Sequence, residues 1–243
     1  MLVLSRQDIE VIGNSVLEDY DKCGIDIMRI PIDIESFARN YLGLTIEYQR
    51  LSENGSILGL TTYGGVILEL ALCDGLLQIT VPEDTVLLDD SLAEVRSLHR
   101  RRFTLAHECA HQILARIEER KTGKNFRTSV VSGRKYSCRE LHKAFDWSEW
   151  QANTLAAGLL IPKQELLKEL SQWGGMRMPT VYGHYFGRRD YRLMKELTAT
   201  FGVSISAMKI RLNELGRLTT KEFSDYVDPY SILPDRWGVA YET

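Results

Sequence analysis

Residues 102–114 read RFTLAHECAHQIL and place His107 and His111 four residues apart, with Glu108 directly after the first histidine. On a helix, side chains at positions i and i+4 lie one above the other, so both imidazoles can bind one metal ion. Glu108 lies beside that face, where it can accept a proton from water that the metal activates and pass it to a leaving amine. Zinc is the expected ion, since imidazole and carboxylate suit it and an open fourth position leaves room for water. The H-E-x-x-H pattern therefore predicts a zinc-binding helix.

This pentad lies within a longer helical pattern that runs from Ser91 to about Arg120. Apolar residues on both sides of the pentad provide a surface that can be buried, namely Phe103, Leu105, Ala106, Ala110, Ile113 and Leu114. The alternative is a pair of ordinary surface histidines on a solvated helix. We expect the buried, metal-binding form.

A zinc site needs a third protein ligand. The candidates downstream are Glu140, His142, Asp146 and Glu149. Glu149 lies on a predicted helix over residues 146–160, whose small alanines would allow a close approach to the pentad helix. Asp146 and Glu149 also fit a capping box, in which Glu149 would have no part in metal binding. His142 is the other alternative, and with Cys138 it could even hold a separate ion.

The rest of the chain predicts an α+β fold with a helical core and a small antiparallel sheet. Helices are expected over residues 5–20 (capped by Ser5), 33–42 (capped by Asp33), 162–173, 190–201 and 204–215. Short strands separated by tight turns are expected over residues 44–48, 57–63, 66–71 and 76–81, and no further strands before the tail. Residues 174–187 read as a glycine-rich, aromatic loop, in which His184 could reach the active cleft and stabilise an oxyanion.

Composition excludes several classes of protein. The chain has 243 residues, 44% hydrophobic and 26% charged, which excludes collagen-like, coiled-coil and wholly disordered chains. Its four cysteines form no C-x-x-C pair, so they predict neither a disulfide framework nor a zinc ribbon. Without an apolar stretch of about 20 residues or a signal-peptide pattern, we expect a cytoplasmic protein with no membrane partner.

The net charge of −3 conceals two blocks of opposite charge. Residues 1–95 carry 5 Lys/Arg and 17 Asp/Glu, whereas residues 96–220 carry 23 and 11. Such blocks can present opposed faces that attract a charged partner, or can simply pair with each other. The sequence leaves both possibilities open.

Two blocks of sequence resemble the ImmA/IrrE family of zinc metallopeptidases. Residues 102–111 are similar to the family pattern R-F-T-x-A-H-E-x-x-H, and residues 149–162, EWQANTLAAGLLIP, to E-x-x-A-N-x-F-A-x-x-L-L-x-P. Weaker likeness at residues 30–33 and 201–216 extends the resemblance over about residues 25–217. The chain departs from the pattern at Leu155, which stands where the family has Phe, and in the longer separation of the two blocks.

The resemblance implies a minimal zincin-like (gluzincin-like) fold in which His107, His111 and Glu149 bind zinc and Glu108 is the general base. It implies an endopeptidase whose protein substrate is a bacterial helix-turn-helix transcriptional repressor, often in stress responses or mobile-element control. The expected organisation is a metallopeptidase domain over residues 1–189 with an insertion at about 118–142, a helix-turn-helix-like pair over 190–217, and a tail over 218–243.

The alternative function is a DNA-binding transcriptional regulator. Residues 197–215 have the rhythm of a helix-turn-helix, with Lys209 and Arg211 on the second helix. These are the two basic residues of that helix before Glu214, so we expect no nucleic acid partner. A third possibility is a binding module in which zinc is purely structural. Glu108 argues against it, because a structural site needs no glutamate at that position.

Overall fold

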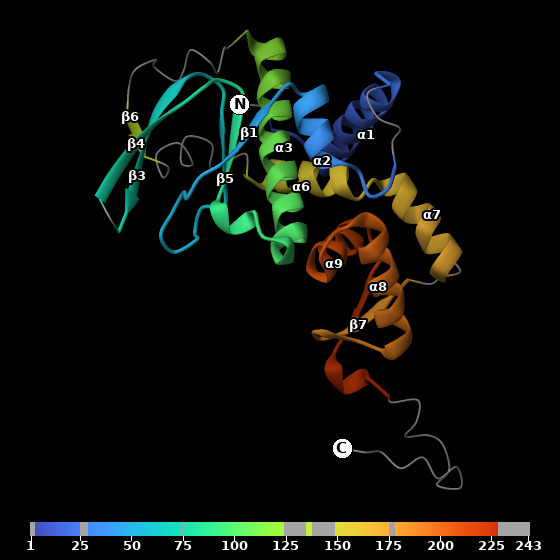
Figure 1. Cartoon of the computed structure of the whole chain (residues 1–243). Helices are drawn as coiled ribbons and strands as arrows, with labels where there is room; N and C mark the ends of the chain where they lie inside the picture. Colours follow the sequence, from blue (N-terminus) through green and yellow to red (C-terminus); the bar gives the residue numbers. More distant parts are fainter. Residues whose placement is uncertain are drawn as a thin grey trace, which may run out of the picture.

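Helix α3 (Leu98–Thr122) passes between the two N-terminal sheets and the remaining helices, and carries the H-E-x-x-H residues at its middle (Figure 1). The computed structural model describes residues 3–24, 29–73, 75–123, 135–137, 149–174 and 178–227. The helical pattern predicted from Ser91 begins with two 3-10 turns, η2 (Asp90–Leu92) and η3 (Val95–Ser97), before α3 itself starts. The helix ends at its C-cap Gly123, whose φ of 68° lies in the left-handed region that favours glycine.

The N-terminal helices begin at the residues that the sequence predicts. Helix α1 (Arg6–Lys22) has Ser5 as its N-cap, in a capping box with Asp8. Helix α2 (Ile34–Ser36) is capped by Asp33, whose side chain accepts from two backbone N–H groups, and it continues as the π-helical turn η1 (Phe37–Tyr41). Both helices bury one apolar face in the main hydrophobic core.

The first sheet is mixed, so the prediction of an antiparallel sheet is wrong here. Its strand order is β1 (Thr45–Tyr48), β5 (Thr85–Leu88), β2 (Gly59–Thr62), with β1 parallel and β2 antiparallel to β5. The prediction also missed β5 itself. All four residues of β5 are buried, so its sequence, TVLL, lacks the alternation that marks a half-exposed strand.

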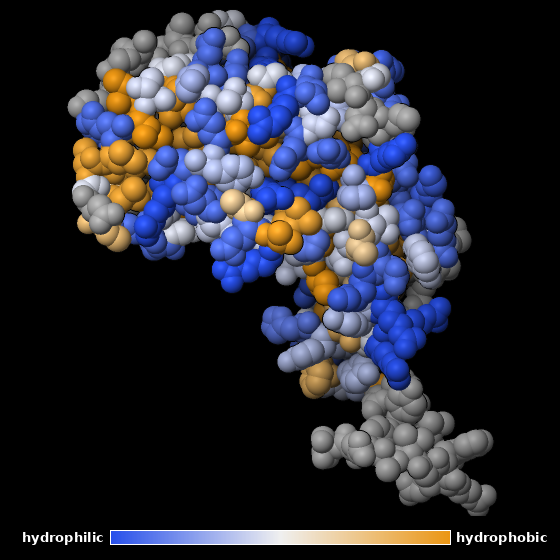
Figure 2. All heavy atoms as spheres, viewed as in Figure 1, coloured by the Kyte–Doolittle hydropathy of each residue, from blue (hydrophilic) through white to orange (hydrophobic). Residues whose placement is uncertain are grey.

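The second sheet has the order β4 (Gly75–Val81), β3 (Val66–Leu72), β6 (Lys135–Ser137). Strands β3 and β4 form the expected antiparallel hairpin, whereas β6 pairs parallel to β3. Part of the predicted insertion at residues 118–142 is therefore regular secondary structure, because the segment includes the end of α3 and contains strand β6. Figure 2 shows hydrophobic side chains at the tip of the β3–β4 hairpin, where Leu76 and Leu77 are exposed.

The described residues of the C-terminal half include four helices and a third small sheet. The helices are α6 (Glu149–Leu160), α7 (Lys163–Gly174), α8 (Arg188–Phe201) and α9 (Ile205–Glu214). The sheet has the order β8 (Tyr185–Phe186), β7 (Thr180–Tyr182), β9 (Thr219–Lys221), with η5 (Phe223–Asp225) after it. The loop predicted at residues 174–187 thus contains a hairpin, and the tail begins with a strand. The protein is a mixed α+β fold.

Helices α8 and α9 share the core of the rest of the protein. Met194, Leu197, Phe201, Met208 and Leu212 belong to the same buried cluster as residues of α1, α3 and α6. A fully buried Arg211 joins these elements, since its guanidinium pairs with Glu10 of α1 and donates to the carbonyl oxygen of Ile161 at 3.1 Å. The division at residue 189 stays a prediction. Among the described helices, none has both the length and the apolar character that crossing a membrane requires.

Candidate metal centre

Helix α6 crosses α3 (Figure 1), and three potential ligands converge at the crossing. The Nε2 atoms of His107 and His111 lie 3.0 Å apart. The two carboxylate oxygens of Glu149, in the first turn of α6, lie 3.2 Å from Nε2 of His107 and 3.1 Å from Nε2 of His111. The spacing of the histidines brings both onto one face of α3, and the packing of α6 brings the carboxylate to them.

The small side chains of α6 permit this close crossing. Ala152, Leu155, Ala156 and Leu159 are fully buried in the main core, together with Leu105, Ala106, Cys109 and Ala110 of α3. Alanines on both helices let the two backbones approach, as the sequence predicted. The ligand set therefore rests on a packed apolar interface and not on a loop.

Asn153 contacts the other nitrogen of the His107 ring. Its Oδ1 atom lies 3.1 Å from Nδ1 of His107, one helical turn after Glu149. When Nδ1 carries the proton and donates it to this oxygen, the lone pair of Nε2 is left free to bind a metal. The same helix thus supplies a ligand and the residue that orients another ligand.

The charges at the site favour ionised Glu149 and protonated His107 when no metal is present. Burial alone would raise the pKa of Glu149, but the hydrogen bonds and charges of His107 and His111 outweigh it and hold this pKa well below its usual range. Burial lowers the pKa of His107, yet the hydrogen bond to Glu149 and the negative charges of Glu108 and Glu149 raise it overall. The site is therefore suited to holding positive charge.

The donor set fits zinc. Zinc takes imidazole nitrogens and carboxylate oxygens at roughly 2.0–2.2 Å, so tetrahedral ligands lie about 3.3 Å from one another. The three contacts of 3.0, 3.1 and 3.2 Å approach this separation. Among the described residues, this is the one group of three or more His, Cys, Asp or Glu side chains close enough to share an ion. Zinc sites with three protein ligands leave a fourth position open, and the described residues supply three.

Glu108 lies on the side of α3 that faces the first sheet. Its side chain is buried, with 4% exposure, and packs against Gly59 of strand β2. This strand lies beside α3, so the carboxylate is held between helix and sheet while the two histidines face α6. Glu108 thus lies on a different side of α3 from the two histidines, and its negative charge still acts on His107.

A buried polar network fixes α3 against the same strand. Gln112 donates from Nε2 to Oγ1 of Thr61 at 2.7 Å and to the carbonyl oxygen of Thr62 at 3.0 Å. Thr62 in turn donates to the carbonyl oxygen of Pro82 and accepts from the backbone N–H of Thr85. Gln112 follows His111 directly, so these bonds set the rotation of the helix at the site.

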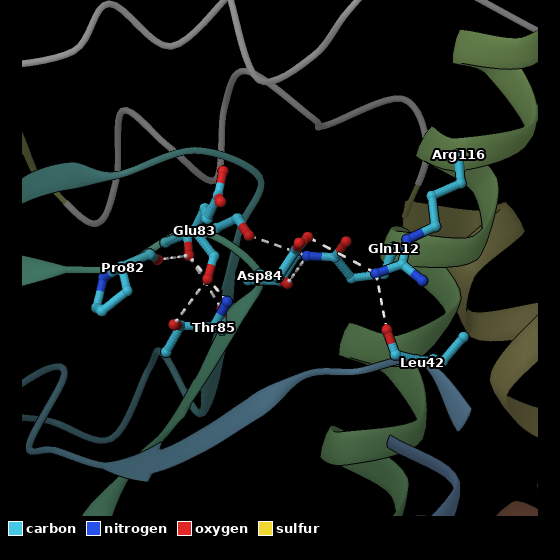
Figure 3. Close-up of polar contacts among 9 residues, drawn as sticks. Leu42, Pro82, Glu83, Asp84, Thr85, Gln112 and Arg116 are labelled. Carbon is cyan, nitrogen blue, oxygen red and sulfur yellow. Dashed lines mark hydrogen bonds and ion pairs between the residues drawn. The ribbon is translucent and has the colours of Figure 1, made fainter. Parts of the chain in front are cut away.

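One turn further along α3, Arg116 makes a second contact to the same end of the sheet. It donates to the carbonyl oxygen of Leu42 at 2.9 Å and lies 3.7 Å from Oδ1 of Asp84. Figure 3 shows Gln112 and Arg116 pointing from the helix toward this region. Together they hold α3 at two successive turns.

Tyr63 is a further polar residue under the influence of the site. It follows β2 and is buried, with 5% exposure. Burial raises the pKa of its hydroxyl, and the negative charges of Glu108 and Glu149 raise it further. The phenol therefore keeps its proton at neutral pH.

The structure brings together His107, His111 and Glu149, the three ligands named from the sequence. The competing candidates Glu140, His142 and Asp146, and Cys138, lie outside the described residues, so the capping-box and His142 alternatives stay open. His184 is exposed in the β7–β8 turn, and β7 is well separated from the crossing of α3 and α6 in Figure 1. The structure does not bring His184 to the site.

Three residues of the site were missed by the sequence analysis: Gly59, Gln112 and Asn153. Asn153 had a detectable signal, because it lies four residues after Glu149 and so shares its helix face. Gly59 and Gln112 had none, since their partners are about fifty residues away in the chain.

Comparison of this chain with protein-family models and with curated proteins finds no match. Its function is therefore inferred from the side chains of the site, together with the resemblance of residues 102–111 and 149–162 to a peptidase family.

Proposed function

We propose that the protein is a zinc-dependent endopeptidase. The observation that carries this proposal is the convergence of His107, His111 and Glu149 from two helices, at 3.0 to 3.2 Å, with a glutamate directly after the first histidine. Structural zinc sites are closed by four protein ligands, whereas peptidases keep three and need a base beside them. The described ligand set and Glu108 fit the second arrangement.

When bound, zinc would polarise the scissile carbonyl and activate water for attack on it. Glu108 acts as the general base, taking one proton from the attacking water as the new carbon–oxygen bond forms. It then gives that proton to the amide nitrogen as the carbon–nitrogen bond breaks, so the carboxylate is regenerated. Asn153 keeps the proton of His107 on Nδ1 and so holds that ring in its metal-binding tautomer.

The proposed fold type is a minimal zincin-like peptidase, supported by an active helix packed between a small sheet and a second, ligand-bearing helix. The proposed substrate is a helix-turn-helix repressor in the cytoplasm of a bacterium, which rests on the resemblance to the ImmA/IrrE family. The acidic block of residues 1–95 supports a basic partner, since exposed opposite charges speed association. Cleavage of such a repressor should slow as salt rises, because the Debye length falls below about 8 Å above physiological ionic strength.

One of the two basic side chains on which the DNA-binding alternative depends is not accessible. Arg211 is fully buried and paired with Glu10, so it cannot reach a phosphate without breaking the core. On α9 this leaves Lys209, which is half-buried. A nucleic acid partner is therefore not proposed.

Metal analysis combined with a cleavage assay tests the proposal. Purified protein is expected to hold one zinc per chain, and His107→Ala, His111→Ala and Glu149→Ala are each expected to lose it, whereas His142→Ala retains it. Retention of zinc by Glu149→Ala with loss in His142→Ala would transfer the third ligand to His142. Full zinc in both histidine variants of the pentad would overturn the site.

A second variant separates chemistry from metal binding. Glu108→Gln keeps the shape of the side chain but cannot accept the proton, so it is expected to retain zinc and fold while cleavage falls about a hundredfold or more. Unchanged turnover would remove Glu108 from the mechanism.

A further inference from the structure

Gly59 of strand β2 has no room for a side chain, because Glu108 and Thr104 fill the space beside its Cα atom. A Cβ atom at this position would lie 2.6 Å from Oε1 of Glu108, 3.1 Å from its Cδ and 2.7 Å from Cγ2 of Thr104. Ordinary van der Waals contacts of a Cβ atom start at about 3.4 Å. All three residues are buried, so the occupied space is enclosed.

The backbone of Gly59 does not itself require glycine. The residue is part of an extended strand and pairs with Leu88 of β5. Glycine within a strand weakens it, and it commonly marks a point where another group approaches the backbone closely. Here the approaching group is the carboxylate of Glu108.

The strand cannot easily retreat from that carboxylate. Two and three residues further along β2, Thr61 and Thr62 are bonded to Gln112, which lies one helical turn after Glu108. On its other side, β2 is paired with the fully buried β5. A side chain at position 59 would therefore displace the side chains on α3 and leave the strand where it is.

We infer that Gly59 is a positioning residue for Glu108, and that its missing side chain forms the space in which the carboxylate is held for proton transfer. This inference rests on the proposed peptidase function for its catalytic meaning. The packing of Glu108 on Gly59, in contrast, is a property of the metal-free protein and can be measured without any activity.

The variant that tests it is Gly59→Ala combined with Thr104→Ser. Thr104→Ser removes Cγ2, so the added methyl group then meets the Glu108 carboxylate alone. The zinc-loaded variant is assayed on a peptide or protein that the parent enzyme cleaves. Its kcat is expected to fall about ten- to a hundredfold, with KM and zinc content unchanged, because a small misplacement of a reacting group slows the reaction strongly. Thr104→Ser alone and Gly65→Ala, a glycine whose Cβ would meet nothing closer than 4.0 Å, are the matched controls and should keep the parent kcat.

A second measurement uses thermal unfolding of the metal-free protein. Adding Gly59→Ala to Thr104→Ser should lower the Tm, and the same addition in a protein that also carries Glu108→Ala should lower it much less. Unchanged kcat, a change confined to KM or zinc content, or an equal loss of Tm in both backgrounds would each overturn the role of Gly59. If the parent protein neither binds zinc nor cleaves, the peptidase proposal fails, while the thermal comparison still decides whether Glu108 occupies the space at Gly59.

Discussion

Asn153 and His107 meet at 3.1 Å between Oδ1 and Nδ1, while Glu149, one turn earlier on the same helix, contacts Nε2 of the same ring. Helix α6 therefore acts on both nitrogens of one histidine. Asn153→Ala removes the acceptor that holds the tautomer, and we expect zinc affinity to fall about 10- to 100-fold. Competition with a chromophoric chelator measures this directly.

Asn153→Asp keeps an oxygen at the same place and should retain most of the affinity, so it serves as the matched control. Equal losses in both variants would show that the contact to Nδ1 does not orient the ring.

Gln112 is expected to stabilise the packing of α3 on β2. Gln112→Met preserves the length of the side chain but leaves the buried carbonyl of Thr62 without this donor, which should lower the free energy of unfolding by about 1–3 kcal/mol. Urea denaturation measures the change. Gln172→Met, at an exposed position of α7, is the control, and an equally small effect in the two variants would contradict the proposed role.

Removing one partner of the buried pair of Arg211 and Glu10 should lower the free energy of unfolding strongly. Arg211→Met leaves the carboxylate of Glu10, whose side chain is 14% exposed, without its partner, at a cost of about 3–5 kcal/mol in the free energy of unfolding. Adding Glu10→Gln should recover much of that loss. A double variant as unstable as Arg211→Met alone would show that the charge of Glu10 is not what destabilises it.

Stability of the metal-free protein should depend on pH through the ligands themselves. The pKa of Glu149 is lowered in the folded protein, so its contribution is present above the ordinary value of 4.5 and is lost as the pH falls through the folded pKa. The pKa of His107 is raised, so its contribution is present below 6.5 and is lost as the pH rises through the folded pKa. Both contributions act together between these two values.

Thermal unfolding in the presence of a chelator, from about pH 5 to 8, measures this dependence. The Tm of the parent protein should fall toward pH 8 more steeply than that of Glu149→Gln, which lacks the ion pair. Parallel curves would show that the pairing does not contribute to stability. Zinc binding should respond oppositely and strengthen with pH, because the histidines must lose their protons to bind it.

Local chemistry explains what the sequence predicted well. The caps at Ser5 and Asp33 involve residues two or three apart, and the facing histidines depend on helical spacing alone. Such patterns are complete within a short segment, so they can be read without knowing the fold.

Pairing between distant segments explains what the prediction missed. Tight turns between short strands predicted an antiparallel sheet, but β1 pairs parallel with β5, about forty residues later, and β6 pairs parallel with β3 from beyond α3. The contact of Gly59 with Glu108 likewise depends on the register of a strand against a helix. Neither residue type nor spacing carries that information, because register is decided by the whole core.

The position of β5 in the first sheet has a consequence for synthesis on the ribosome. This central strand is the last of the three strands of its sheet to be synthesised. Strands β1 and β2 therefore lack their pairing partner until Thr85–Leu88 has left the exit tunnel. Helix α3 emerges immediately afterward and covers the strand just completed. A nascent chain stalled before Thr85 presents unpaired strand edges, the surfaces through which incomplete chains aggregate. The stretch before Thr85 is therefore the part most exposed to such association during synthesis, and all three proposed metal ligands follow it in the chain.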